Sequence, residues 1–150
     1  TAIFTGNYTV ASVITGTYST SDNDSGSFTL NYNIVYENNS SLAYTKSQWG
    51  MSDGTSLYFF TVDLSGSIVS LAAPGGCRYT GSVSIIDAQY NLYAIDLTAK
   101  NCSGSYVARN GNFSGVGALF DSNKSFRVLV GDAKTTFFVE LSNASIGQAN

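Results

Sequence analysis

Apolar and polar residues alternate along most of the chain. Residues 27–36 place an apolar or aromatic side chain at every second position, and Ser, Thr or Asn occupies most of the positions between them. This period of two is typical of a β-strand that buries one face and exposes the other to water. The apolar set of this segment is Phe28, Leu30, Tyr32, Ile34 and Tyr36.

The same pattern predicts about ten strands, each of roughly 5 to 10 residues. Clusters rich in Asn, Asp, Gly and Ser separate several of them, as expected of tight turns. No stretch shows a sustained helical period with a cap at each end. The predicted strands are residues 4–10, 14–18, 27–36, 42–46, 58–64, 79–85, 93–97, 113–119, 126–130 and 137–141.

These strands predict an all-β protein with a single domain over residues 1–150. Strands joined by short turns pair antiparallel and must protect their sheet edges. We therefore expect one antiparallel meander of about 8–10 strands closed into a small barrel, with a β-sandwich as the alternative. A recurring triplet favours the barrel, because its final glycine permits strong strand coiling. The triplet is a hydrophobic residue, Ser or Thr, and Gly, as in residues 4–6, 79–81 and 113–115, although glycine is also simply common in the chain.

The two cysteines, Cys77 and Cys102, predict a disulfide. The chain has no histidine and no CxxC pair, so a zinc site lacks its ligands. A bridge between them would pin a hairpin that turns near residues 87–91. Disulfides persist in oxidising compartments, so we expect a periplasmic, outer-membrane-anchored or secreted protein. The start at Thr1 fits an export signal that has been removed.

Charge and composition exclude several functions. The net charge is −3 and the seven Lys and Arg residues are scattered, so a nucleic-acid partner is not expected. Without histidine, the usual general base for a Ser or Cys nucleophile is missing, and we expect no enzyme and no cofactor. Two oxygen-rich turns, at residues 22–25 and 121–132, are explained by Asx-turn chemistry, and we expect no metal site.

The chain carries four short motifs, at residues 76–81, 90–93, 101–104 and 111–115. They resemble small β-barrel surface lipoproteins of Gram-negative bacteria, and the likeness covers residues 60–141. This resemblance implies a barrel fold and a lipid anchor on a removed N-terminus, and it implies no shared activity. Residues 14–18 also resemble a hairpin of avidin-type barrels, but one Trp cannot build their aromatic box.

Aromatic residues give the only hint of a binding surface. Phe59 and Phe138 each adjoin an inward-facing aromatic residue, and Trp49 precedes the turn at Gly50. If they point outward together, they form an exposed apolar patch that marks a partner or sugar site. Burial under a neighbouring loop is the alternative.

The leading prediction is a non-enzymatic binding module of the bacterial envelope that engages a protein partner through loops or strand edges. One alternative is a carbohydrate-binding or adhesin domain, suggested by the Asn, Thr, Ser and Tyr content and by Trp49. Another is a lipocalin-like carrier of a small apolar ligand, although the inward Tyr and Phe side chains are expected to fill the barrel. A membrane-spanning barrel is disfavoured because several strands are too short. Eight Asn-x-Ser/Thr sequons keep a eukaryotic glycoprotein open.

Overall fold

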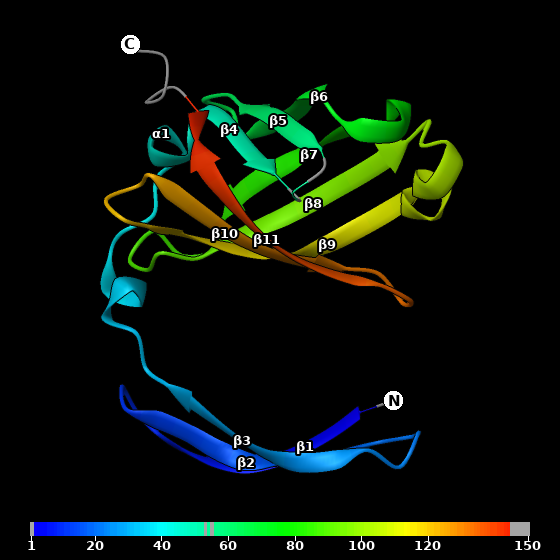
Figure 1. Cartoon of the computed structure of the whole chain (residues 1–150). Coiled ribbons are helices and arrows are strands. Elements are labelled where there is room, and N and C mark those ends of the chain that lie inside the picture. Colours follow the sequence, from blue (N-terminus) through cyan, green and yellow to red (C-terminus); the bar gives the residue numbers. More distant parts are fainter. Residues whose placement is uncertain (1, 53, 55, 145–150) are drawn as a thin grey trace. The chain divides into compact units, whose positions relative to one another are not determined.

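The computed structural model describes residues 2–52, 54 and 56–144, and the chain divides into two compact units. The first unit comprises residues 1–34 and the second comprises residues 35–150. Each unit is described separately below. Both consist of antiparallel strands (Figure 1).

The first unit is a three-stranded meander. Its strands are β1 (Ala2–Thr9), β2 (Val13–Thr20) and β3 (Ser25–Asn31), paired in the order β1-β2-β3. The register gathers the apolar side chains on one face, where Phe4 lies 6.3 Å from Tyr18 and 5.9 Å from Phe28 between ring centroids. Ser, Thr and Asn dominate the other face.

The second unit is a closed eight-stranded antiparallel barrel with strand order β10-β11-β4-β5-β6-β7-β8-β9. Strands β4 and β11 are the first and last barrel strands along the chain. They pair with each other at Gly50–Ser142 and Trp49–Asn143, and this pairing closes the barrel. The predicted all-β class and the barrel are therefore confirmed, and the sandwich is not formed. The barrel strands are β4 (Ser47–Ser52), β5 (Leu57–Val62), β6 (Ser67–Ala72), β7 (Arg78–Ile85), β8 (Tyr93–Lys100), β9 (Gly111–Phe120), β10 (Ser125–Gly131) and β11 (Thr136–Asn143).

In the described part of the chain, four short helical segments connect or cover the strands. They are η1 (Ile34–Glu37), α1 (Leu42–Thr45), η2 (Pro74–Gly76) and η3 (Gly104–Arg109). Residues 42–46 were predicted as a strand, and the structure corrects this to α1. Ser41 explains the difference, because its hydroxyl accepts a hydrogen bond from the Ala43 N–H at 3.2 Å and caps the helix.

Strand boundaries differ from the sequence pattern in two further places. The alternation over residues 27–36 continues past the end of β3 at Asn31, and its last residues form η1 instead. Strands β4 and β6 were not predicted. Both barrel strands carry only short apolar runs, and in β4 the inward side chains are Trp49 and Met51.

Strands β7 and β8 form the predicted hairpin. Arg78 pairs with Lys100 and Ile85 with Tyr93. The Cys77–Cys102 disulfide lies next to the Arg78–Lys100 pair, at the end of the hairpin away from its turn. Both the bridge and the register that it implied are confirmed.

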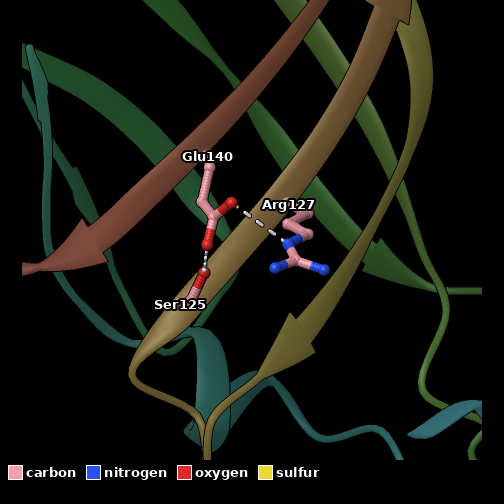
Figure 2. A network of polar contacts seen from close by, with 3 residues as sticks. All are labelled: Ser125, Arg127 and Glu140. Carbon is pink, nitrogen blue, oxygen red and sulfur yellow. Dashed lines mark hydrogen bonds and ion pairs between the residues drawn. The ribbon is translucent and has the colours of Figure 1, made fainter.

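On the outer surface, β10 and β11 are linked by a small polar network (Figure 2). The Ser125 hydroxyl donates to one carboxylate oxygen of Glu140 at 2.8 Å, and Arg127 Nε donates to the other at 3.2 Å. Arg127 and Glu140 are direct cross-strand partners. Both side chains are more than 40% exposed, so the pair specifies register more than it stabilises the fold.

Candidate ligand cavity

The barrel is hollow. Its interior contains a cavity of about 180 Å³, which is room for about six water molecules at roughly 30 Å³ each. Seventeen side chains of the described residues line the cavity, and most are aliphatic or aromatic. The aliphatic part of the wall includes Ile95, Leu97, Val128, Val130 and Val139.

One end of the barrel is closed by α1 and an aromatic cluster. Trp49 is fully buried, and its indole N–H donates to the Thr45 carbonyl at 2.7 Å. Phe126 packs 5.6 Å from Trp49 and 5.9 Å from Tyr93 between ring centroids. The Tyr93 hydroxyl donates to the Ser41 carbonyl at 3.2 Å. Burial raises the pKa of Tyr93, so this phenol stays neutral at physiological pH.

The segment before α1 is fixed to the same end. Ser40 donates its N–H to the Ala88 carbonyl and its hydroxyl to the Asp87 carbonyl. The buried Asn91 side chain accepts from the Leu119 N–H at 3.0 Å and donates to the Leu119 carbonyl at 2.6 Å. These bonds satisfy the buried polar groups and seal this end.

Arg109 lies at the opposite end, among tyrosines. The β4–β5, β6–β7, β8–β9 and β10–β11 connections all lie at this end because the strands alternate in direction. The Arg109 guanidinium donates to the Tyr58 hydroxyl at 2.6 Å. It also stacks over the Tyr106 ring at 4.7 Å from the centroid. Partial burial favours the neutral form of Arg109, but hydrogen bonds to the hydroxyls of Tyr58 and Tyr79 outweigh it and raise the pKa. The group is therefore a permanent cation.

The loop that carries Arg109 is held in place on both sides. The disulfide joins its start at Cys102 to Cys77 at the end of η2. The Asn110 side chain accepts from the Cys102 N–H and donates to the Cys102 carbonyl, both at 3.0 Å. Ser103 donates its N–H and its hydroxyl to the Gly75 carbonyl. Arg109 is thus positioned by the bridge and by Asn110.

No protein-family model, curated protein or solved structure matches this chain. The functional argument therefore depends on its own residues. Among the described residues, no group of three or more Cys, Asp or Glu side chains is placed to hold a metal ion. Over the same residues, no helix is both long and apolar enough to cross a membrane.

The structure separates the three aromatic residues expected to form a surface patch. Trp49 is fully buried and lines the cavity, so it cannot join an exposed surface or stack on a sugar there. This corrects the expectation that it points outward. Phe138 is 65% exposed, as expected, and lies opposite Leu129 on β10. Phe59 is partly exposed on β5. No described contact brings Phe59 and Phe138 together.

The sequence left a hollow barrel only as a less favoured alternative, and it did not point to Arg109 as part of a site. The alternation identified the inward positions of β5, β7 and β8 correctly. It does not give the volume that the inward side chains leave free inside the barrel. Arg109 stands in a turn-like Arg-Asn-Gly sequence, which gave it the appearance of a solvated loop residue. Its proximity to the cysteine bridge was the one available signal.

Proposed function

We propose that this protein binds one small apolar ligand inside its barrel. The observation that carries the proposal is the cavity of about 180 Å³ with its predominantly apolar wall. An eight-stranded barrel is just wide enough either to be filled by side chains or to hold one small ligand. Enclosed apolar cavities near this size accept molecules such as benzene or xenon.

The energetic cost of the cavity supports this proposal. The unfilled space of about 180 Å³ lacks the packing contacts that a filled barrel interior would make. Larger side chains at Leu97, Val128 or Val139 would recover part of that loss. A chain that served only as a stable scaffold would gain from filling the space, whereas a ligand carrier needs it open.

Trp49 provides a direct test, because it is the only Trp in the chain and it lines the cavity. Toluene is a suitable neutral probe. We expect toluene to change the Trp49 fluorescence in a saturable titration and to raise the melting temperature, because it binds only the folded barrel.

Two matched variants make the test specific. Leu97→Phe adds an aromatic ring inside the cavity, while Leu129→Phe adds the same ring on the outer face of the barrel, where Leu129 is exposed. Toluene should bind Leu129→Phe like the native chain and should bind Leu97→Phe at least about tenfold more weakly. Equal binding to both variants, or no binding to the native chain, would overturn the proposal.

The proposed setting is the periplasm or the cell exterior, because a disulfide persists in an oxidising compartment. The lipoprotein-type anchor and the absence of enzymatic activity remain predictions from the sequence.

The sheet of β1–β3 favours a second candidate function, which is engagement of a protein partner. Phe4 is 67% exposed, and Tyr8 and Leu30 are also exposed. Exposed apolar faces and unpaired edge strands are common features of protein interfaces. Affinity capture from native envelope extracts should then recover one partner with the native chain and lose it with Phe4→Ser. Recovery of the same proteins by both would remove this candidate.

A further inference from the structure

We infer that the ligand carries a carboxylate, and that Arg109 binds this group at the open end of the cavity. The inference rests on the proposed function and names the chemical class of its ligand. It predicts an amphiphile with a small apolar body directed toward Trp49 and an anionic head directed toward η3.

The charge of the cavity wall carries the inference. Among the described residues that line the cavity, Arg109 is the only charged one. Within the described part of the chain, the only ion pair closer than 4.0 Å is Arg127–Glu140, so no described carboxylate neutralises Arg109. A cation beside an apolar wall is costly unless an anion or several hydrogen bonds compensate it. The hydroxyls of Tyr58 and Tyr79 stabilise the cation, and because a guanidinium has five N–H donors, they leave donors free for a ligand.

The geometry prepares Arg109 for this role. Its contact with the Tyr58 hydroxyl and its stacking on Tyr106 hold the planar group at the cavity. Gly75 packs closely against Tyr106, because a Cβ added at Gly75 would lie within 3.0 Å of the Tyr106 side chain. A guanidinium held in this way loses little side-chain freedom when it binds, and its parallel N–H groups match the two oxygens of a carboxylate.

A carboxylate fits better than a phosphate. A phosphate monoester carries close to two negative charges at neutral pH, and the wall offers one cation. The second charge would be left in apolar surroundings, which is costly. The size of the cavity further limits the body of the ligand to roughly a benzene ring or a short acyl chain.

The test compares hexanoate with hexan-1-ol, which have the same apolar chain length and differ in the charge of the head. Affinities are measured by Trp49 fluorescence and calorimetry. The native chain should bind hexanoate about ten- to a hundredfold more tightly than hexan-1-ol, since a hydrogen bond to a charged group has that effect on an equilibrium. Hexyl phosphate should bind more weakly than hexanoate, and tighter binding would overturn the choice of a carboxylate.

Arg109→Gln tests the residue itself. This variant should lose the preference for hexanoate while its affinity for hexan-1-ol changes by less than about threefold, which shows that the cavity is intact. Arg109→Lys keeps the charge without the planar pair of donors and should recover part of the preference. Arg127→Gln removes an arginine from the outer face of the barrel and should bind both probes like the native chain.

The outcomes separate this inference from the proposed function. If neither probe binds the native chain, the proposed function fails. If both probes bind equally and Arg109→Gln changes neither affinity, the cavity binds ligands but the inference about the carboxylate is wrong.

An internal partner for Arg109 is the remaining alternative. Asp53 follows β4 in the sequence and lies outside the described residues. We expect Asp53→Asn to leave the hexanoate affinity within about threefold of the native value. A double-mutant cycle in which Asp53→Asn and Arg109→Gln are strongly coupled in ligand-free protein would overturn the inference.

Discussion

Gly66 is a single residue on which the closed end of the barrel depends. It has a positive φ of 80° in the β5–β6 turn, and its carbonyl accepts a hydrogen bond from the Val83 N–H at 2.7 Å. A Cβ at this position would overlap the Val83 carbonyl oxygen. Only glycine combines this backbone angle with so close an approach between strands.

Gly66→Ala should therefore lower the free energy of unfolding by more than about 2 kcal/mol, from left-handed strain and the steric overlap together. Denaturant unfolding followed by Trp49 fluorescence measures the change. Gly104→Ala is the matched control, because Gly104 also has a positive φ of 60° but nothing lies within 4 Å of an added Cβ. A loss for Gly66→Ala no larger than that for Gly104→Ala would contradict the explanation.

The stability that Glu140 contributes should depend on pH. Hydrogen bonds from Ser125 and Arg127 lower the pKa of Glu140 below its ordinary value of 4.5. A carboxylate with a depressed folded pKa stabilises the protein above its unfolded pKa, and this stabilisation disappears as the pH falls through the folded pKa. The contribution of Glu140 should thus be complete above about pH 5 and be lost in stronger acid.

Melting temperatures of native protein and Glu140→Gln across the acidic range measure this effect. The small difference between them should be constant near neutral pH and shrink toward zero in acid. A difference that grows as the pH falls would contradict the assigned direction.

At the scale of elements, the predicted strands match the structure where the alternation is long and both neighbours are strands. The β7–β8 hairpin is the clearest case, because its inward residues Tyr79, Val83, Tyr93 and Ile95 are all buried. The pattern failed at residues 42–46, because a helix of one turn has too few residues to show its own period. It also missed β4, whose burial depends on closure with β11, a contact between distant parts of the chain.

The disulfide links two connections at the open end of the barrel, and its removal should affect stability and binding. Replacing both Cys77 and Cys102 with Ala should cost about 3.5 kcal/mol of stability, as the chain-entropy model gives for a loop of about 26 residues. Because the bridge holds the loop of Arg109, hexanoate affinity should fall more than hexan-1-ol affinity. Calorimetric unfolding and the two titrations measure both effects. Unchanged stability with equal losses for both probes would contradict this role.

At the scale of the whole molecule, the candidate site was less predictable than the fold. Period-two patterning fixes which side chains face inward, and it led to the barrel. The volume left inside depends on strand count, closure and how eight sets of side chains interdigitate. The inward Tyr and Phe residues suggested a filled interior, and the cavity of about 180 Å³ shows that they leave space.

The division into two units predicts that the barrel folds without the first one. Residues 35–150 contain all eight barrel strands and helix α1, which covers one end of the barrel. A fragment of these residues should melt cooperatively within about 5 °C of the intact chain, since a change below 1 kcal/mol shifts the midpoint by no more than a few degrees. Circular dichroism and Trp49 fluorescence measure the transition. An unfolded fragment would show that the barrel requires residues 1–34.

The central claim is that the barrel has an open apolar interior built to hold a ligand. Crystals of the native chain exposed to pressurised xenon test it most directly, because xenon enters dry apolar cavities without needing a polar contact. We predict one strong anomalous peak inside the barrel, between Trp49 and the wall formed by Ile95 and Val128, which is absent from Leu97→Phe. A native interior filled by side chains, with no xenon bound within it, would contradict the claim.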